Sequence, residues 1–217
     1  MKIVVFANGP FTARECAKNM CGQAELIIAV DGGIRHCEAL DIRPDILLGD
    51  LDSAPADCVA RASGSKVTLL RYPGDKDKTD LELALDLACS RGATTVSLFG
   101  ALGGRWDMSL ANLLLPAGPT YECMRISLYG DRTRIDLLRC NDRLNLSATP
   151  DSRVSLIPIN GPAEGITLTG FKYPLTDHTI SFGSTLGISN VLLDGTGSIV
   201  MEKGTLLCFL TEPDITG

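Results

Sequence analysis

Short runs of Val, Ile and Leu recur through the first 130 residues of the chain, and a helical pattern separates each run from the next. The runs lack the apolar–polar alternation of a half-exposed strand, so they predict strands that are buried on both faces. The expected strands cover residues 2–7, 25–30, 45–49, 66–71, 95–100 and 125–129. Strands that alternate with helices indicate a parallel sheet covered on both sides.

The segments between these runs have the spacing of amphipathic helices. In the segment 79–90, four apolar residues fall at positions i, i+3, i+4 and i+7, which places them on one helical face: Leu81, Ala84, Leu85 and Ala88. Thr79 and Glu82 have the spacing of a capping box, which marks a helix N-terminus. The expected helices are 12–21, 34–40, 55–63, 79–90 and 106–115.

The pattern changes after residue 131, where helical spacing stops. Strand-like runs then follow one another at intervals of roughly ten residues, separated by turn-forming residues. These runs cover residues 133–139, 143–148, 153–159, 165–170, 178–183, 197–204 and 205–210. The spacing predicts a small antiparallel sandwich or barrel. We therefore expect two domains, 1–131 and 132–217, in a chain of α/β class.

Composition narrows the classes of function. A chain of 217 residues, 45% hydrophobic and 21% charged, is typical of a globular protein with ample core. The net charge of −6 argues against a nucleic-acid surface, because phosphate backbones are held by clustered Lys and Arg. No apolar run approaches the roughly 20 residues of a membrane span, and the N-terminal run is too short for a signal peptide. We expect a cytoplasmic protein that binds neither nucleic acid nor membrane.

Eight cysteines do not indicate a disulfide framework, because no C-x-x-C pair occurs and five of them lie inside apolar stretches: Cys16, Cys37, Cys58, Cys89 and Cys208. Reduced cysteines that act as small core residues are the preferred interpretation. A zinc site is disfavoured because ligand spacing is missing and the chain has only two histidines, His36 and His178.

Acidic residues and one arginine follow four successive expected strands. They are Asp31 after 25–30, Asp50 and Asp52 after 45–49, Asp75, Asp77 and Asp80 after 66–71, and Arg105 and Asp107 after 95–100. Ligands of parallel α/β sheets bind beyond the carboxyl ends of the strands, so these groups are expected to converge at one site.

Local roles could account for single members of this set. Asp80 fits the first turn of helix 79–90, and Asp52 or Ser53 could cap the helix that Pro55 begins. Capping explains neither the paired spacing of Asp50 and Asp52 nor the convergence of the four groups.

The pair Asp50 and Asp52 predicts a metal site. At positions i and i+2 of an extended chain, both side chains would point to one side. Two carboxylates aimed at one spot repel unless a cation lies between them. Mg²⁺ fits, because it takes one or two carboxylates and completes its shell with water and substrate phosphates. A polyphosphate could not enter such an acidic pocket without that charge.

The phosphate-binding elements are unusual, because neither G-x-x-x-x-G-K-[ST] nor G-x-G-x-x-G is present. Glycines instead follow strands in the segments 8–10, 31–33 and 100–105. Gly32 and Gly33 precede an expected helix, so their backbone N–H groups could meet phosphate. Tight turns that require positive φ are the alternative explanation for each glycine.

Several ordered motifs resemble the thiamine pyrophosphokinases. They are AVDGGIRHCEALDIRPDILLGDLDS at 29–53, YPGDKDKTDLELAL at 72–85 and LFGALGGRWDMSLANLLL at 98–115. In the second half, VSLIPI, TGFKYPL and GISN are similar to the family's C-terminal domain. The resemblance covers nearly the whole chain, with the motifs in the right order.

The resemblance implies a Rossmann-like catalytic domain that binds ATP and Mg²⁺, followed by a β-sandwich that binds thiamine, in a homodimer. It implies the reaction ATP + thiamine → AMP + thiamine diphosphate. Asp50, Asp52 and Asp80 would be the metal carboxylates, and Asp31 and Asp77 would complete the acidic site.

The resemblance also implies roles for residues outside the metal site. Arg105 and Asp107 would line the substrate and phosphate region. From their residue types alone, we also expect at the nucleotide site the glycines that could meet phosphate and the lysines that could offset its charge: Gly32, Gly33, Gly103, Gly104, Lys76 and Lys78. Ser189 and Asn190 would bind thiamine at the subunit interface, and Tyr173 could offer it a ring face. A simple turn is the alternative for Ser189 and Asn190, and packing is the alternative for Tyr173.

One departure concerns Met108, which stands where bacterial members often carry His, so a proton-transfer role cannot apply there. The neighbouring Trp106 is expected in the core rather than in a pocket wall. Three other functions remain open: a pyrophosphokinase for a pterin alcohol, a non-catalytic nucleotide sensor and a Mg²⁺-dependent phosphohydrolase. The β-rich second half favours thiamine.

Overall fold

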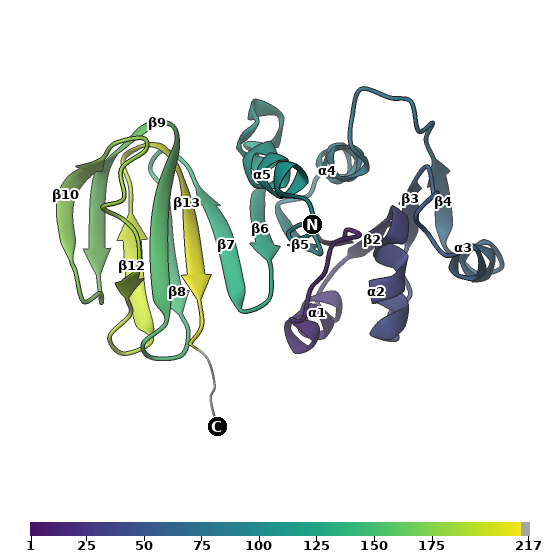
Figure 1. Cartoon of the computed structure of the whole chain (residues 1–217), viewed down its shortest axis with the longest axis horizontal. Coiled ribbons are helices and arrows are strands. Elements are labelled where there is room, and N and C mark those ends of the chain that lie inside the picture. The colour runs from purple at the N-terminus through teal and green to yellow at the C-terminus, as the bar shows by residue number, and fades with distance from the viewer. Residues whose placement is uncertain (214–217) are drawn as a thin grey trace. The chain divides into compact units, whose positions relative to one another are not determined.

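The structure, a computed structural model, describes residues 1–213 of the chain. The chain forms two compact units, Met1–Asp131 and the part from Arg132 onward (Figure 1). The chain is of α/β class: its strands pair in parallel in the first unit and antiparallel in the second. No helix among residues 1–213 is long and apolar enough to cross a membrane.

The first unit is built on a parallel sheet. Its strands are β1 (Lys2–Phe6), β2 (Leu26–Val30), β3 (Ile46–Gly49), β4 (Thr68–Arg71), β5 (Thr95–Phe99) and β6 (Arg125–Tyr129). They lie in the order β4-β3-β2-β1-β5-β6, and every neighbouring pair is parallel. The parallel sheet predicted from the apolar runs is confirmed, with each strand end within two residues of its expected place.

The strand order reverses between β1 and β5. The chain builds outward from β1 to β4 and then returns to place β5 beside β1. The segments that follow these two strands are tied together, because Gly9 N donates to Gly100 O at 2.7 Å. Open α/β sheets bind ligands at such a reversal, outside the carboxyl ends of the strands.

Helices cover both faces of this sheet (Figure 1). They are α1 (Arg14–Cys21), α2 (Ile34–Ala39), α3 (Ala56–Ser63), α4 (Asp80–Ser90) and α5 (Trp106–Leu114), with 3₁₀ turns at Asp31–Gly33, Leu115–Ala117 and Pro119–Tyr121. Residues of α1, α2 and α3 share one apolar cluster with Phe6, Ala29 and Leu47 of the sheet. Helix α4 packs against β2 and β3 from the other face.

The predicted N-cap of α4 at Thr79 is confirmed, whereas the Glu82 carboxylate of the expected capping box lies 3.5 Å from Lys78 Nζ. Thr79 Oγ1 accepts a hydrogen bond from Glu82 N at 3.2 Å, and the four apolar residues of the expected face are buried. Helix α3 differs, because among the described residues no side chain caps its first turn and Pro55 is the N-cap. Asp52 and Ser53 are therefore not caps, which removes the local explanation for them.

The cysteines divide between core and surface. Cys37, Cys58 and Cys208 are buried free thiols, which confirms them as core residues. Cys16 and Cys89 are only partly buried, so the core assignment holds for three of the five. Burial raises the pKa of the Cys58 thiol to about 11, which keeps it protonated and inert at neutral pH.

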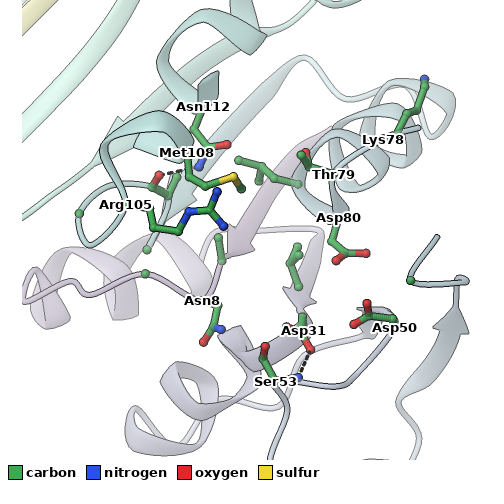
Figure 2. Close-up of a pocket in the computed structure, with 18 of the residues that line it drawn as sticks. Asn8, Asp31, Asp50, Ser53, Lys78, Thr79, Asp80, Arg105, Met108 and Asn112 are labelled. Carbon is green, nitrogen blue, oxygen red and sulfur yellow. Dashed lines mark hydrogen bonds between the residues drawn. The ribbon is translucent and has the colours of Figure 1, made fainter. Parts of the chain in front are cut away.

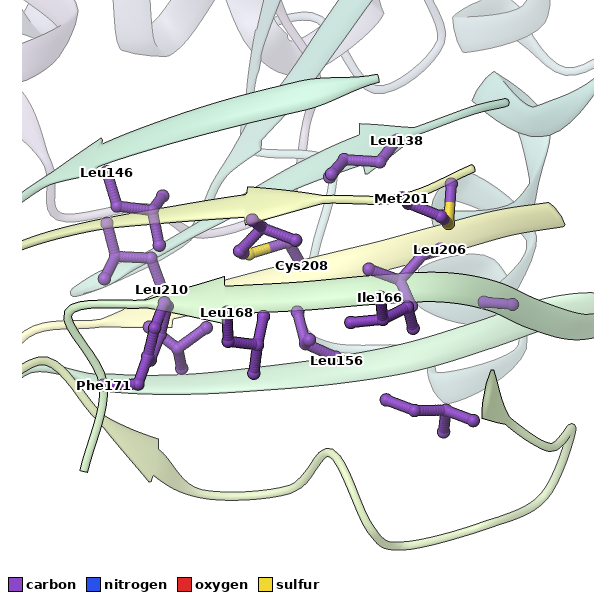
Figure 3. Packing of buried hydrophobic residues seen from close by; sticks show 14 of the residues in the cluster. Leu138, Leu146, Leu156, Ile166, Leu168, Phe171, Met201, Leu206, Cys208 and Leu210 are labelled. Atoms are coloured by element: carbon purple, nitrogen blue, oxygen red, sulfur yellow. The ribbon is translucent and has the colours of Figure 1, made fainter. Parts of the chain in front are cut away.

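The second unit consists of antiparallel strands. They are β7 (Thr133–Leu138), β8 (Arg143–Ser147), β9 (Arg153–Thr169), β10 (Leu175–Ile180), β11 (Asn190–Val191), β12 (Thr196–Val200) and β13 (Lys203–Thr211). Strand β9 is central, because β10, β11, β12 and β13 all pair with it. Apolar residues from these strands form one core (Figure 3).

Strand β9 corrects the prediction of separate strands at 153–159 and 165–170. It is a single strand of 17 residues that bends at Asn160 and Gly161, whose φ angles are 61° and 117°. Its first half pairs with β11 and β13, and its second half pairs with β10 and β12, while β13 also reaches Glu164 beyond the bend. The residues N-G-P thus form a bulge inside a strand, because backbone partners continue on both sides of it.

Candidate active site

A cleft of about 550 Å³ opens at the carboxyl ends of the parallel strands (Figure 2). It collects predicted residues from four separate segments: Asp31, Asp50, Lys76, Lys78, Asp80, Gly103 and Arg105. In Figure 2 the carboxylates Asp31, Asp50 and Asp80 gather on one side, and Met108 and Asn112 lie on the other. The expected convergence of the strand exits therefore occurs.

Asp31, Asp50 and Asp52 form a carboxylate trio, with one oxygen of each lying within 4.8 Å of the others. Asp31 is only 9% exposed. Burial raises the pKa of its carboxyl group, and the charges of Asp50 and Asp52 raise it further. Hydrogen bonds from Gly32 and Ser53 lower this pKa, but by less. Three hard oxygen donors held together at the cost of repulsion are a suitable donor set for Mg²⁺.

The trio depends on left-handed backbone at Asp31 and at Leu51, the residue between its other two members. Leu51 has φ of 66° and Asp31 has φ of 47°, which are strained values for residues with side chains. The turn at Leu51 lets Asp52 N donate to Asp50 Oδ1 at 3.2 Å. The two carboxylates are therefore close, but the expectation that an extended chain points them to one side is wrong. Their proximity comes from the turn.

Asp80, the third expected metal carboxylate, lies at the start of α4 and outside the trio. Its buried Oδ1 forms an ion pair with Lys76 Nζ at 3.0 Å, without hydrogen-bond geometry. Lys76 Nζ also donates to Pro73 O at 2.9 Å, so this lysine fixes the loop before α4. The structure thus groups Asp31, rather than Asp80, with Asp50 and Asp52. The metal role of Asp80 stays a prediction.

Lys78 is held along the surface of α4. Its Nζ lies 2.6 Å from Asp86 Oδ2 and 3.5 Å from Glu82 Oε1. Tyr121, which is buried, donates its hydroxyl to the other Asp86 oxygen at 2.9 Å. The charge of Lys78 is therefore already paired with two carboxylates of α4.

Arg105 and Asp107 pair with each other at the start of α5. Arg105 Nε donates to Asp107 Oδ1 at 3.1 Å, and both side chains are exposed. The hydrogen bond from Arg105 holds the pKa of Asp107 below its usual range. Arg105 lines the cleft, whereas Asp107 does not, and Asp77 is exposed in the loop before α4.

The predicted glycines serve different purposes. A Cβ at Gly33 would lie 2.1 Å from Phe6 O, and one at Gly32 would lie 2.2 Å from Asn8 Oδ1, so both permit close packing against the end of β1. Gly103 and Gly104 instead adopt φ of 94° and 70°, which a tight turn requires. The contact of these N–H groups with phosphate stays a prediction.

Two residues of α5 show what the sequence did not reveal. Asn112 is buried, lines the cleft and donates its Nδ2 to Ala101 O at 2.7 Å. The sequence feature that could have revealed Asn112 is a single amide side chain within an apolar helix, one turn after Met108. Trp106 is 89% exposed, so its predicted place in the core is wrong. It is the first residue of α5, where no neighbouring turn covers it.

In the second unit, Asn190 is 8% exposed and contacts the backbone of Tyr173. Ser189, rather than Asn190, takes the left-handed conformation expected for a turn, with φ of 59°. Ser189 N donates to Ser155 Oγ at 3.0 Å. Tyr173 is 59% exposed as a residue, so it does not pack in the core.

Comparisons with known proteins agree with this arrangement. The family described as "Thiamin pyrophosphokinase, catalytic domain" matches residues 17–128, and "Thiamin pyrophosphokinase, vitamin B1 binding domain" matches residues 143–206. The chain belongs to the thiamine pyrophosphokinase family. The first family domain includes the carboxylate trio and the cleft-lining residues from Val30 onward, and the second includes Tyr173, Ser189 and Asn190.

Individual members of the family extend the likeness over the whole chain. Thiamine pyrophosphokinase of Bacillus subtilis is 32% identical over 206 residues, which are 94% of this chain and 96% of that protein. Its crystal structure superposes with a TM-score of 0.85 at 29% identity, covering 98% of this chain and 100% of that one. The crystal structure of thiamin pyrophosphokinase from Geobacillus thermodenitrificans gives a TM-score of 0.83 at 30% identity, with 99% of both chains covered.

Proposed function

We propose that the cleft of Met1–Asp131 binds ATP with Mg²⁺ and that the unit from Arg132 onward binds thiamine. The chain is a thiamine diphosphokinase, which transfers the pyrophosphoryl group of ATP to the hydroxyl of thiamine and gives thiamine diphosphate and AMP. The observation that carries the proposed nucleotide site is the trio of Asp31, Asp50 and Asp52, of which Asp31 and Asp50 line the cleft.

The two units fit the domain types of this proposal. The strand order β4-β3-β2-β1-β5-β6, with its reversal between β1 and β5, supports a Rossmann-like catalytic domain over residues 1–131. Antiparallel strands around one apolar core support a β-sandwich as the thiamine-binding domain over 132–217.

Asp31, Asp50 and Asp52 would hold Mg²⁺, and Asp80 would join them if Lys76 released it. Bound there, Mg²⁺ would neutralise charge on the phosphate oxygens, which a cleft lined by carboxylates cannot do by itself. Asp77 and Asp107 belong to the proposed site through the motif alone, because both lie outside the cleft lining.

The chain's own residues contribute positioning and positive charge. The thiamine hydroxyl would attack the β-phosphorus and expel AMP, a transfer that needs alignment and charge neutralisation rather than a covalent intermediate. Arg105 and Lys76 lie at the cleft and would offset charge that develops on the phosphates. Met108, which also lines the cleft, has no group that could accept the hydroxyl proton.

Thiamine-dependent release of AMP from ATP tests this function. We expect AMP and thiamine diphosphate to form in equal amounts when ATP, thiamine and Mg²⁺ are all present. A pterin alcohol in place of thiamine should give no AMP, which separates the proposal from a pterin pyrophosphokinase. AMP release with water alone would indicate a phosphohydrolase, and ATP binding without turnover would indicate a sensor.

We further propose a cytoplasmic homodimer with two-fold symmetry, the commonest closed assembly. Light scattering at micromolar concentration should give twice the mass of the chain. A monomeric mass in a preparation that retains full activity would contradict the dimer and leave the catalytic assignment intact.

A further inference from the structure

Two cysteine thiols of the first unit lie side by side, away from the cleft. The Sγ atoms of Cys89 and Cys123 are 3.9 Å apart, although 34 positions separate the two residues in the chain. Cys89 lies in the last turn of α4, at the opposite end of this helix from the cleft-lining Asp80, and Cys123 lies in a turn after Pro119–Tyr121. A disulfide needs sulfur atoms about 2.0 Å apart, so the two atoms would have to approach by about 2 Å.

The segments that carry the two thiols are already bound to each other. Cys89 Sγ donates to Thr120 O at 3.6 Å, and Tyr121 donates its hydroxyl to Asp86 Oδ1 at 2.9 Å. Tyr121 is buried, and its carbonyl accepts from Met124 N at 3.0 Å, which closes the turn between them. A bond between the sulfur atoms would therefore join two surfaces that pack together without it, so the cross-link should carry little strain.

The two thiols differ in their access to solvent. Cys123 is exposed, whereas Cys89 is partly buried. Burial raises the pKa of the Cys89 thiol, and the neighbouring Cys123 and the charge of Asp86 raise it further. The thiolate is the form that reacts with oxidants, so Cys89 is the less reactive of the two at neutral pH. Cys123 is thus the thiol that a small oxidant in solution reaches first.

We propose that Cys89 and Cys123 form a peroxide-reactive pair, in which oxidation of Cys123 is followed by formation of a disulfide with Cys89. Hydrogen peroxide would transfer one oxygen to Cys123 Sγ, with cleavage of the O–O bond and release of water, which leaves a sulfenic acid. Cys89 Sγ then attacks that sulfur, so the S–S bond forms, the S–O bond breaks and a second water leaves. In total the two thiols lose two hydrogen atoms, and one peroxide is reduced to two waters.

The pair would protect the exposed thiol from irreversible damage. A sulfenic acid with no thiol beside it is open to further oxidation to sulfinic acid, which ordinary reducing agents do not reverse. Cys89 is held in contact with Cys123, so its effective concentration is high and the disulfide forms first. In a reducing compartment the disulfide returns to two thiols. This inference does not depend on the proposed function, because neither thiol lines the cleft.

Peptide mapping of the full-length protein tests the proposal. Fully reduced protein is treated with hydrogen peroxide, the remaining thiols are blocked with iodoacetamide, and the protein is digested with trypsin without reduction. Cys89 and Cys123 fall on separate tryptic peptides, 79–91 and 106–125, and neither peptide contains another cysteine. We expect the two peptides to be joined, with the mass of two hydrogen atoms missing, and to separate after treatment with dithiothreitol.

Three variants separate the roles of the thiols. Cys123→Ser should leave Cys89 as a thiol that iodoacetamide still blocks. Cys89→Ser should leave Cys123 first as a sulfenic acid, which dimedone traps, and then as a sulfinic acid, which dithiothreitol does not reverse. Cys140→Ser is the matched control, because it removes an exposed thiol of the second unit and should form the same joined peptides as the wild type.

Thermal melting shows whether the bond forms in the folded protein. Oxidation should raise the thermal midpoint by about 5 °C or more, because the disulfide constrains the unfolded chain, and dithiothreitol should remove the increase. An unchanged or lower midpoint would mean that the chain must open before the bond forms, which would overturn the proposal. Unlinked peptides in the oxidised wild type, sulfinic acid at Cys123 despite the presence of Cys89, or peptide 106–125 joined to a second copy of itself would overturn it as well.

Discussion

Replacing Asp50 with Asn is expected to lower turnover by about two to three orders of magnitude, the usual cost of losing one group that stabilises charge in a transition state. Asp50 is one of three carboxylates whose oxygens lie within 4.8 Å, and an amide of the same shape removes its charge. The fold should be retained, because Asp50 lies outside the apolar core and Asn can still accept the bond from Asp52 N. In metal-free protein the thermal midpoint should stay the same or rise, since one of three like charges is gone.

Two measurements check this expectation. Turnover is determined at saturating ATP and thiamine over a range of Mg²⁺ concentrations, and thermal melting is followed with and without Mg²⁺. Wild-type protein should be stabilised by Mg²⁺, and Asp50→Asn should lose that stabilisation. Asp75→Asn is the matched control, because Asp75 is exposed near the same site and outside the trio. Near-wild-type turnover of Asp50→Asn at saturating Mg²⁺ would show that the metal assignment is wrong.

Replacing Gly33 with Ala is expected to lower the free energy of unfolding by about 3 kcal/mol or more, at the upper end of overpacking effects. The new Cβ would lie 2.1 Å from Phe6 O and 2.7 Å from its carbonyl carbon. This backbone cannot move aside, because Phe6 is fully buried and pairs with Ala29 on one side and Phe99 on the other. Ala7 and Asn8, which follow Phe6, line the cleft, so activity should fall together with stability.

Gly22→Ala provides the control for this prediction. Gly22 has φ of −64° at the end of α1, and its added Cβ would meet no atom closer than 3.6 Å. Alanine there should be neutral or stabilise by about 0.4–1 kcal/mol, because it restricts the unfolded chain. Urea unfolding followed by circular dichroism measures both variants. Equal stability of Gly33→Ala and wild type would mean that β1 and the Asp31–Gly33 turn do not pack as closely as the structure has them.

Several parts of the fold could be predicted from the sequence because they follow from local patterns. Apolar runs indicate strands that are buried on both faces. The buried face of α4 is indicated by the helical spacing of its apolar residues, Leu81, Ala84, Leu85 and Ala88. The N-cap hydrogen bond from Glu82 N to Thr79 needs only residues three apart in the chain. Once the strands were expected to be parallel, the acids that follow them had to collect at one edge of the sheet.

The composition of the trio, by contrast, was decided by tertiary structure. Asp31 follows β2 and Asp50 follows β3, so only the pairing of these neighbouring strands brings the two carboxylates together. The left-handed backbone at Leu51 then directs Asp52 toward them. Asp80 follows the same rule of strand exits, yet its partner is Lys76. A sequence pattern indicates which end of the sheet a side chain occupies, but not which neighbour lies within 5 Å.

The second unit shows the same division. Turn-forming residues at Asn160 and Gly161 predicted two separate strands. Strand β9 continues through them, because β13 pairs with it before this point and β10 and β12 pair with it after. Asn190 carried the signal of a turn or a ligand contact, whereas its partner is the backbone of Tyr173, 17 residues away in the chain. By itself, the sequence of this protein determined the parallel strands β1 to β6, the helices α1 to α5 and the edge of the sheet that carries the acids. The pairing of β9, the members of the trio and the partner of Asn190 were decided by contacts between distant segments, because such contacts depend on packing that no local period records.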